Sequence, residues 1–254
     1  MKVLFTDLDG TLLDASYRPA GEALRALLDA GVMVVWCSSK TFDEQRHLAE
    51  TLGVPGLFVT ENGGGVGVPP GFPRCDLHAP PIEIGGWGID YREVRRRLTE
   101  AAEETGVRIR PYGDMTPDEV AEVTGLTREE AERARNRRWS ETFLVGRKPG
   151  VLVGALDRRG LRVQRGSRFW TTHGRHDKGT GVRWFLRRLR DRQPITFAVG
   201  DAPNDLPMLA EVDHPILLPA LDGRPVEADL PGLVRLDEPG HAGFSRAARI
   251  VLER

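Results

Sequence analysis

Cysteine is scarce in this sequence, which has only Cys37 and Cys75 among its 254 residues. Two cysteines cannot form the framework of several disulfides that stabilises small secreted domains. The chain also lacks any apolar run near the roughly 20 residues that a membrane-spanning helix needs. Its first apolar segment leads directly into Asp7 and leaves no room for a secretion signal. We therefore expect a cytoplasmic protein without a membrane partner.

An excess of charge of either sign is also absent. The chain has 36 basic and 37 acidic residues, so its formal net charge is −1. This balance excludes a general attraction to nucleic acid or to a membrane surface. The arginine-rich segments 95–97 and 133–138 are interleaved with or flanked by glutamates, including Glu93, Glu100 and Glu132. We predict that these segments are solvated helix faces and that nucleic acid is not a partner.

Lysine is rare too, because only four of the basic residues are lysines: Lys2, Lys40, Lys148 and Lys178. A lysine at a special place in the chain is therefore informative. Lys178 directly follows His176-Asp177 and begins a predicted helix, where it could neutralise charge on a transferring phosphoryl group. The alternative is an ordinary surface cation. The six histidines show no zinc-binding spacing, and we predict that His173 and His176 are structural or line the substrate site.

What the chain does contain is an alternation of apolar strands and helices. Such alternation is typical of an α/β fold with a doubly wound, Rossmann-like parallel sheet. The predicted strands are 2–6, 32–37, 57–60, 195–199 and 216–218, and the main predicted helices are 22–30, 43–52, 178–192 and 244–252.

The pattern changes in the middle of the chain, where the helices are charged and the strands more isolated. Predicted helices cover 90–105 and begin near Thr116 and Thr127, and predicted strands cover 107–110, 142–145, 161–165 and 169–172. Thr127 and Glu130 form a capping-box pattern. We therefore predict a core of residues 1–78 and 173–254, with an α+β domain of residues 79–172 inserted into it.

Two carboxylates follow the first predicted strand, at Asp7 and Asp9. The carboxyl end of a strand is where open α/β sheets bind ligands. One carboxylate could attack a phosphorus atom and the other could transfer the proton of the leaving group, with a divalent cation between them. Asp-Gly is also a common turn dipeptide, so an ordinary turn is the alternative.

Two other predicted strands end in groups that suit phosphate chemistry. Ser38 follows the second strand, where its hydroxyl and backbone N–H could hold a phosphate oxygen. Asp201 and Asp205 follow the strand 195–199, and carboxylates are suitable ligands for Mg²⁺. Each of these could be a simple strand-end cap or loop, but their order and strand-end positions favour a single phosphate site.

Taken together, these motifs resemble the haloacid dehalogenase (HAD) superfamily of phosphohydrolases. They are Asp-x-Asp-Gly-Thr, a strand-ending Ser, a later Lys and Gly-Asp-x-x-Asn-Asp, and the insert resembles a Cof-type cap. Within the superfamily, residues 6–14, 38–41, 61–64 and 200–209 are similar to the mannosyl-3-phosphoglycerate phosphatase family. Ser38-Ser39-Lys40 replaces the Thr-Gly-Arg of most relatives, and segments 138–143 and 166–169 are also similar to that family.

The resemblance implies a role for each motif residue. Asp7 would be the nucleophile that forms an aspartyl-phosphate, and Asp9 would protonate the leaving oxygen and then activate water. Ser38 and Lys178 would hold the phosphoryl oxygens. Mg²⁺ would be bound by the Asp7 carboxylate, the Asp9 carbonyl and Asp201, with Asp205 or Asn204 in support.

The implied substrate is a small phosphorylated glycoside with a phosphate, a carboxylate and a neutral sugar. Its carboxylate could bind backbone N–H groups and Lys40, or Arg165 and Arg168 of the insert. Gly166-Ser167-Arg168 is the candidate substrate loop. The predicted contacts to hydroxyls are Glu61, Asn62, Ser140, Glu141 and Ser167, and further predicted substrate contacts are Ser39, Gly63 and Asn204.

The sequence leaves alternatives to a phosphatase that acts on a mannosyl-phosphoglycerate. The substrate could be a glucosyl-phosphoglycerate or another sugar phosphate, and a phosphomutase would share the Asp-x-Asp pair. A non-catalytic sugar-phosphate sensor should have lost one of Asp7, Asp9, Lys178 or Asp201, and all are present. The sequence leaves both a monomer and a homodimer open.

Overall fold

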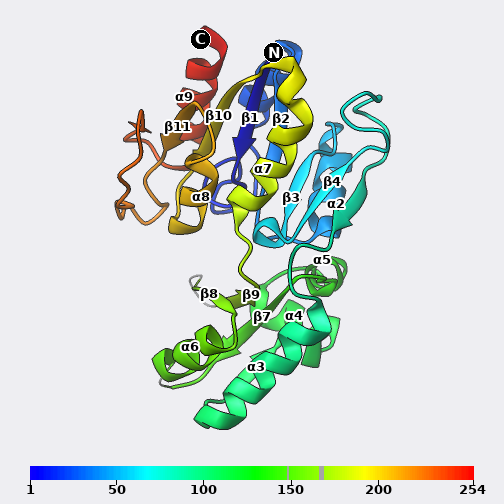
Figure 1. The fold of residues 1–254 in the computed structure, drawn as a ribbon, viewed down its shortest axis with the longest axis vertical. Coiled ribbons are helices and arrows are strands. Elements are labelled where there is room, and N and C mark those ends of the chain that lie inside the picture. Colours follow the sequence, from blue (N-terminus) through cyan, green and yellow to red (C-terminus); the bar gives the residue numbers. More distant parts are fainter. Residues whose placement is uncertain (148, 166–168) are drawn as a thin grey trace.

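The computed structural model describes residues 1–147, 149–165 and 169–254 of the chain. An eight-stranded sheet and a four-stranded sheet form two separate lobes, one above the other in Figure 1. We call the part from α3 to β9 the small lobe and the rest the large lobe. Both chain ends belong to the large lobe, far from the small one.

The large lobe is built on a mostly parallel sheet, as predicted for an α/β fold. The parallel strands run in the order β12-β11-β10-β1-β2-β3, and the antiparallel strands β4 and β5 extend the β3 edge. Their bounds are β1 Lys2–Thr6, β2 Met33–Cys37, β3 Phe58–Thr60, β4 Gly65–Val68, β5 Ile82–Gly85, β10 Ile195–Gly200, β11 His214–Leu217 and β12 Val234–Arg235.

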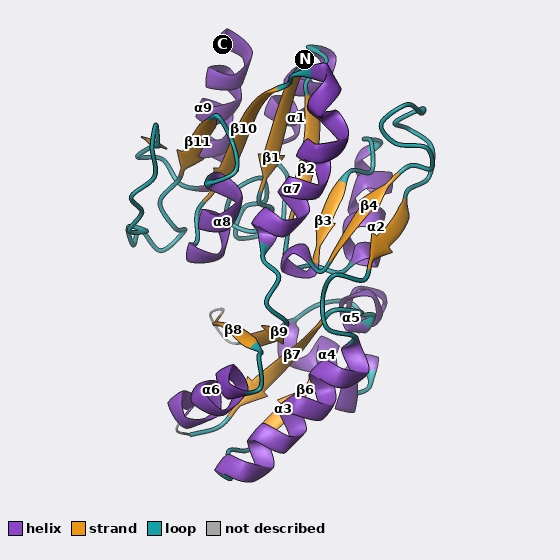
Figure 2. Cartoon of the chain, in the orientation of Figure 1, coloured by secondary structure: helices purple, strands orange, loops and turns teal. Residues whose placement is uncertain are grey.

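Helices cover both faces of this sheet, so its central strands are buried on both sides. In β1, Leu4 packs into the cluster that also holds side chains of α1, α2 and α9. Its neighbours Val3 and Phe5 pack into the cluster under α7 and α8. The helices are α1 Gly21–Asp29, α2 Phe42–Leu52, α7 Lys178–Leu189, α8 Leu206–Leu209 and α9 Gly240–Glu253. Figure 2 shows these layers.

The antiparallel pair β4 and β5 was not predicted, because its glycines give a weak strand signal. A Cβ at Gly67 would lie 2.6 Å from the Phe58 ring and 2.8 Å from the Phe42 ring, so glycine makes room for both aromatic rings. β5 falls inside the predicted insert of 79–172, yet it pairs with β4 in the large sheet. The large lobe thus extends past residue 79 of the sequence.

The small lobe is an antiparallel sheet with helices on both faces, in the order β6-β7-β9-β8. α3 and α6 pack on one face with Phe143, whereas α4 and α5 pack on the other with Leu144. The elements are α3 Tyr91–Thr105, β6 Ile109–Pro111, α4 Pro117–Thr124, α5 Arg128–Arg135, β7 Ser140–Val145, α6 Pro149–Arg158, β8 Arg162–Arg165 and β9 Trp170–His173.

Local sequence explains most of the helix starts in the small lobe. Thr116 and Thr127 each form a capping box, which begins α4 and α5 where the sequence predicted. Helix α6 was not predicted, because Pro149, Gly150 and Gly154 are weak helix formers.

Among the described residues, no helix is both long and apolar enough to cross a membrane.

Candidate active site

The polar residues of the predicted phosphate site lie at the carboxyl ends of parallel strands. Asp7 follows β1 and Asp201 follows β10, and the two strands pair with Thr6 opposite Val199. The backbone N–H of Asp7 continues the ladder and donates to the Val199 carbonyl at 2.9 Å. Because the strands are parallel and adjacent, both carboxylates reach the edge of the sheet that faces the small lobe (Figure 1).

Lys178 links two of these carboxylates. Its Nζ lies 2.5 Å from Asp7 Oδ1 and 2.5 Å from Asp205 Oδ1, and its side chain is only 1% exposed. Burial lowers the pKa of Lys178, but Asp205 and Asp7 raise it by more, so the net pKa is above the ordinary value. The ammonium is therefore charged at the place where a phosphoryl group would gain negative charge.

Three carboxylates form an acid cluster, which we define as Asp7, Asp201 and Asp205. One oxygen from each lies within 4.8 Å of the others. Burial, with Asp205 and Asp201 nearby, raises the pKa of Asp7 well above its usual range despite the opposing effect of Lys178. Burial and then Asp205 raise the pKa of Asp201 to about 6. The cluster brings three carboxyl groups together beside the single charge of Lys178, and its oxygen donors suit a hard divalent cation.

Short contacts fix the acid cluster in place. Thr11 Oγ1 donates to Asp201 Oδ1 at 2.9 Å. Gly10 has φ +89°, and a Cβ there would lie 2.4 Å from Asp201 Oδ2, so only glycine fits. Asp205 Oδ2 accepts the backbone N–H groups of Asp201 and Ala202, each at 2.9 Å. Both oxygens of Asp205 are thus held by the protein, which suits a supporting position beside the cation site.

Asp9 lies apart from the acid cluster and is more accessible. Its side chain is 41% exposed, and its Oδ1 is 3.1 Å from Lys40 Nζ. The Lys40 ammonium also lies 5.0 Å from the centre of the Tyr17 ring. Burial lowers the pKa of Lys40, but Asp9 and Glu44, with a smaller effect of Tyr17, together raise it by more, so this lysine remains a cation. The Asp9 carboxylate is thus accessible from solvent, unlike the buried acid cluster, and its predicted role in holding Mg²⁺ falls to its backbone carbonyl.

Ser38, Asn62 and Asn204 lie near one another beside the strand ends. Ser38 is buried, its Oγ accepts the Lys40 backbone N–H at 3.2 Å, and its carbonyl accepts the N–H of Asn62 at 2.9 Å. Asn204 Nδ2 donates to Asn62 Oδ1 at 3.4 Å. Asn62 Nδ2 is buried and has no hydrogen-bond partner within the described part of the chain, so it is available to an anionic oxygen.

Glu61 and Ser140, both predicted to bind sugar hydroxyls, form a hydrogen bond with each other between the two lobes. Both are fully buried. The Glu61 carboxylate accepts Ser140 Oγ at 2.5 Å and the N–H groups of Arg138 and Trp139 at 2.8 and 3.1 Å. We call this set of contacts, together with Arg137, the Glu61 latch. A carboxylate with these donors is committed to joining the lobes.

Arg137 was predicted to lie on a solvated helix face, and this was wrong. Its side chain is 5% exposed, and its Nε lies 3.7 Å from Glu61 Oε2. Its Nη2 donates to the carbonyl of Ser39, predicted as a substrate contact, at 2.7 Å. The arginine is buried because it lies in the segment between α5 and β7, which contacts Ser39 and Glu61 of the large lobe, and not on the helix surface.

Glycines let the two lobes approach closely beside the latch. A Cβ at Gly64 or at Gly85 would lie 2.3 Å from a Trp139 side-chain atom. Gly63, another predicted substrate contact, has φ +95°, and a Cβ there would lie 1.8 Å from the Asp177 carbonyl oxygen. Gly63 therefore has a packing role between the turn after β3 and the start of α7.

The remaining predicted substrate residues belong to the small lobe. Arg165 is exposed on β8, and its guanidinium lies 5.8 Å from the centre of the Trp170 ring. Glu141 is buried and accepts the Tyr91 hydroxyl at 2.9 Å, so it stabilises the small lobe. Ser167 and Arg168, with Gly166, lie outside the described residues.

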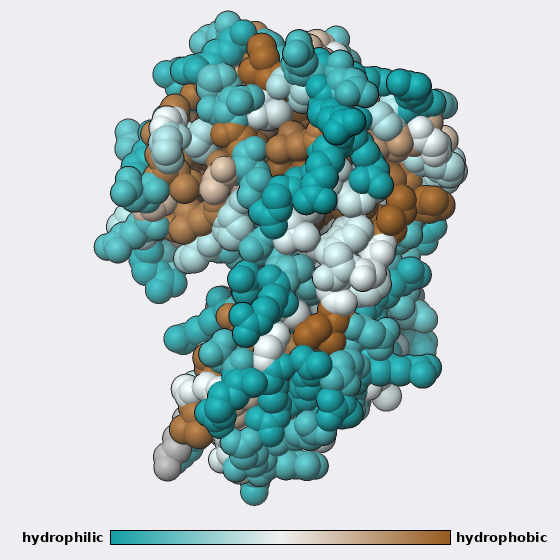
Figure 3. All heavy atoms as spheres, viewed as in Figure 1, coloured by the Kyte–Doolittle hydropathy of each residue, from teal (hydrophilic) through white to brown (hydrophobic). Residues whose placement is uncertain are grey.

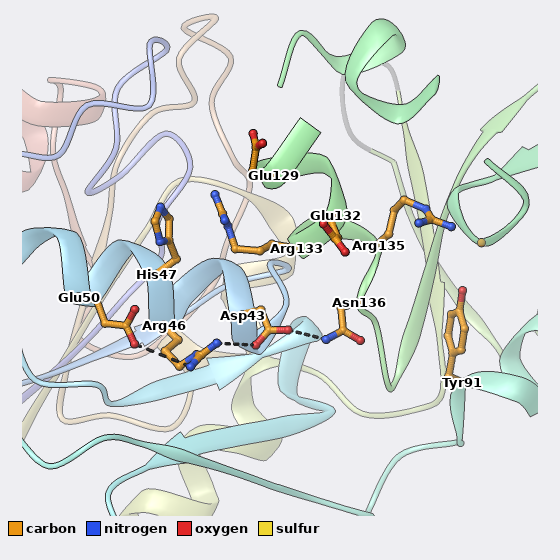
Figure 4. Close-up of a pocket in the computed structure, with 11 residues that line it drawn as sticks. Asp43, Arg46, His47, Glu50, Tyr91, Glu129, Glu132, Arg133, Arg135 and Asn136 are labelled. Atoms are coloured by element: carbon orange, nitrogen blue, oxygen red, sulfur yellow. Dashed lines mark hydrogen bonds and ion pairs between the residues drawn. The ribbon is translucent and has the colours of Figure 1, made fainter. Parts of the chain in front are cut away.

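Open space lies between the lobes at more than one place. Figure 3 shows a hollow on the side where α8 and β8 approach each other. A pocket of about 800 Å³ lies where α2 approaches α5 (Figure 4), and its described lining does not include the acid cluster. Arg46 and Asn136 both contact Asp43 there. Charges of both signs line this pocket, so it has no clear preference for an anion.

Three residues of the site were missed from the sequence. Thr11 stood inside the motif Asp-Gly-Thr, so its hydroxyl was a recognisable candidate. Nothing in the sequence indicated that Arg137 is buried, because it stands among several other arginines. Tyr17 gave no signal either, because an exposed aromatic residue in a loop is common.

Comparisons with known proteins identify the relatives of this chain. Residues 4–69 match the family described as haloacid dehalogenase-like hydrolase. A protein of Persephonella marina named glucosyl-3-phosphoglycerate/mannosyl-3-phosphoglycerate phosphatase is 33% identical over 96% of this chain and 95% of its own length. The mannosyl-3-phosphoglycerate phosphatase of Pyrococcus furiosus is 34% identical over 86% of this chain and 91% of its own length.

A solved structure shows the same fold over nearly the whole chain. It is a phosphatase of the HAD superfamily from Bacteroides thetaiotaomicron, with a TM-score of 0.67 and 19% identity. The match covers 99% of this chain and 95% of that one. At this identity the likeness concerns the fold, so the chemistry must be argued from the residues of this chain.

Proposed function

This chain belongs to the haloacid dehalogenase-like hydrolases, and we propose that it is a Mg²⁺-dependent phosphatase that converts mannosyl-3-phosphoglycerate to mannosylglycerate and phosphate. The observation that carries the chemistry is the position of Lys178, 2.5 Å from both Asp7 and Asp205 at the strand ends. The names of relatives with more than 30% identity support the choice of substrate.

The reaction that we propose has two steps, both centred on Asp7. An oxygen of Asp7 attacks phosphorus, the bond from phosphorus to the ester oxygen breaks, and Asp9 gives its proton to that oxygen. Water then attacks the aspartyl-phosphate while Asp9 accepts a proton. Phosphate leaves and Asp7 is restored. The difference in burial supports this separation of roles, because Asp7 is buried and the Asp9 side chain is 41% exposed.

Positive charge is essential, because a carboxylate and a phosphate dianion repel each other. Lys178 supplies one charge next to Asp7. We propose that Asp7, Asp201 and the Asp9 carbonyl hold Mg²⁺, with Asp205 or Asn204 in support. When bound, the cation adds positive charge against the phosphoryl oxygens. Ser38 and Asn62 would donate to the same group, and the lack of a hydrogen-bond partner for the buried Asn62 Nδ2 within the described residues supports this role.

A glucosyl-3-phosphoglycerate is the second candidate substrate. The name of the Persephonella marina relative includes both the glucosyl and the mannosyl compound. The two sugars differ at one stereocentre, and the phosphate and glycerate parts are the same. The residues around Asp7 can act on either, so any preference must come from groups that contact the sugar.

We also propose that the small lobe, which makes up most of the predicted insert of residues 79–172, acts as the cap that selects the substrate. Its sheet lies opposite the strand ends that carry the acid cluster (Figure 1).

A cytoplasmic location is supported by the two cysteines, Cys37 and Cys75, which are both free thiols. The expected partner is the small-molecule substrate.

A phosphate-release screen tests the proposed function. The purified protein is given the mannosyl and glucosyl 3-phosphoglycerates, several hexose phosphates and a hexose bisphosphate, each with and without Mg²⁺. We expect the glycosyl-3-phosphoglycerates to have the highest kcat/KM and the reaction to need Mg²⁺. Preference for a hexose phosphate would reject the substrate, and isomerised product without phosphate release would indicate a phosphomutase.

A further inference from the structure

Lys40 is a cation at the site that the proposed reaction does not use. Of the other described lysines, Lys178 is closed between two carboxylates, and Lys2 Nζ donates to the carbonyls of Val251 and Leu252 at 2.8 and 3.0 Å. The Lys40 side chain is 18% exposed, compared with 1% for Lys178. The Lys40 side chain therefore keeps some exposed surface, whereas that of Lys178 is enclosed.

The backbone of Lys40 is fixed, so the side chain starts from a defined place. Its N–H donates to Ser38 Oγ at 3.2 Å, and its carbonyl accepts the Glu61 N–H at 3.0 Å. The ammonium contacts Asp9 on one side and lies near the Tyr17 ring on the other. An ammonium has three donors, so it can hold Asp9 and a second acceptor at once.

The position of Asp9 places this ammonium beside the leaving group. A proton donor works at about 2.6–3.2 Å from the oxygen that it protonates. Since Lys40 Nζ is 3.1 Å from Asp9 Oδ1, the ammonium lies within roughly 6 Å of the leaving oxygen when Oδ1 is the atom that donates the proton. In a 3-phosphoglycerate the carboxylate is separated from that oxygen by only two further carbons. The carboxylate therefore comes within reach of Lys40.

We infer that Lys40 is a specificity-determining residue that binds the carboxylate of the leaving group. The inference rests on the proposed function, because it needs a substrate with a carboxylate next to the phosphate ester. Lys40 separates such substrates from sugar phosphates of similar size that lack the carboxylate. Arg165 on β8 is the competing cation, since it is exposed and belongs to the small lobe.

The test compares two substrates that differ only in the carboxylate. They are mannosyl-3-phosphoglycerate and the analogue whose carboxylate is reduced to a hydroxymethyl group. The readout is the ratio of kcat/KM for the two, because an effect through Asp9 or on the folded fraction changes both and cancels. Lys40→Gln should lower this ratio by roughly 10- to 150-fold, the range expected for a charge-assisted hydrogen bond.

Two further variants complete the test. Lys40→Arg keeps the charge and should retain most of the ratio, and Arg165→Gln is the matched control and should leave it unchanged. An unchanged ratio in Lys40→Gln, or a ratio that falls in Arg165→Gln instead, would overturn the inference. Failure of the proposed function would appear separately, as a wild-type protein that hydrolyses neither compound.

Discussion

At the scale of single residues, the acid cluster is the feature with the clearest consequence. Asp7 and Asp201 have raised pKa values because they are buried near other carboxylates. A protein holds such groups together when something else supplies positive charge, and Lys178 supplies only part of it. The cluster therefore predicts a stabilising effect of a divalent cation on the fold, apart from its effect on the reaction.

We predict that Mg²⁺ raises the melting temperature of the chelator-treated protein and restores its phosphatase activity. Binding to the folded state alone should add about 2.7 kcal/mol of stability at a hundredfold excess over Kd. The measurement is thermal unfolding against Mg²⁺ concentration, with Asp201→Asn as the variant that should respond weakly. Zn²⁺ should substitute poorly, since the ligands are oxygens. Full activity of the metal-free protein would contradict this prediction.

At the scale of structural elements, the turn after β3 organises the site. Glu61 and Asn62 have φ values of +45° and +58°, which turn the chain back toward the ends of β2 and β3. The same turn bonds to the loop of Ser38 and Lys40 and, through the Glu61 latch, to the segment before β7. One turn thus positions both the phosphate-binding loop and the small lobe.

We predict that Arg137→Met lowers the free energy of unfolding by about 3 kcal/mol, because it leaves Glu61 buried without its cation. Glu61→Gln/Arg137→Met should lose less than the sum of the two single variants, since the pair is removed together. Urea unfolding measures all three. Arg128→Met, which removes an exposed arginine near Asp118, is the control and should cost less than about 1 kcal/mol. Strictly additive losses would show that the two residues do not act as a pair.

Much of the element structure could be predicted from sequence, and the failures have local causes. The strands around Asp7 and Asp201 are continuous apolar runs, and the helices that begin at Thr116 and Thr127 have capping boxes. β4 and α6 were missed because glycine and proline weaken their patterns. The Glu61 latch was missed because it joins residues 61 and 140, and such long-range contacts leave no periodic signal. The sequence motifs alone predicted that Asp7, Lys178 and Asp201 belong to one site, and the structure brings the three side chains together.

At the scale of the whole molecule, a buried histidine pair lies where the chain returns from the small lobe to the large one. His173 ends β9, and His176 precedes α7 by two residues. Their rings stack with centroids 4.7 Å apart. Burial, and then the neighbouring His176, lowers the pKa of His173 to about 3, and burial lowers the pKa of His176 to about 4. Both histidines are therefore neutral in the folded protein at neutral pH.

We predict that this pair makes the protein less stable as the pH falls below about 6.5, the ordinary pKa of histidine. Below that pH the two histidines bind protons in the unfolded chain but stay neutral in the folded chain. The free energy of unfolding therefore keeps the full contribution of the pair above about pH 6.5 and loses it progressively toward pH 4. The loss should approach about 2 kcal/mol per histidine at pH 5. Urea unfolding at pH 7.5 and pH 5 measures it. The raised pKa values of Asp7 and Asp201 have the opposite effect, because they increase the free energy of unfolding as the pH falls. The contribution of the histidines must therefore be measured by comparison with a variant.

His176→Gln is that variant, since it removes one titrating ring from the pair. Its unfolding free energy should change less between pH 7.5 and pH 5 than that of the wild type. The same dependence in both proteins would show that the pair does not control acid stability.

The central proposal is that Asp7 becomes phosphorylated during turnover. The direct measurement is to mix the Mg²⁺-loaded protein with mannosyl-3-phosphoglycerate labelled in its phosphate, stop the reaction with acid within one turnover, and map the labelled peptide. We predict label on Asp7, none in Asp7→Asn, and at least about a thousandfold loss of phosphate release in that variant. Label on another residue, or phosphate release by Asp7→Asn near the wild-type rate, would contradict the mechanism.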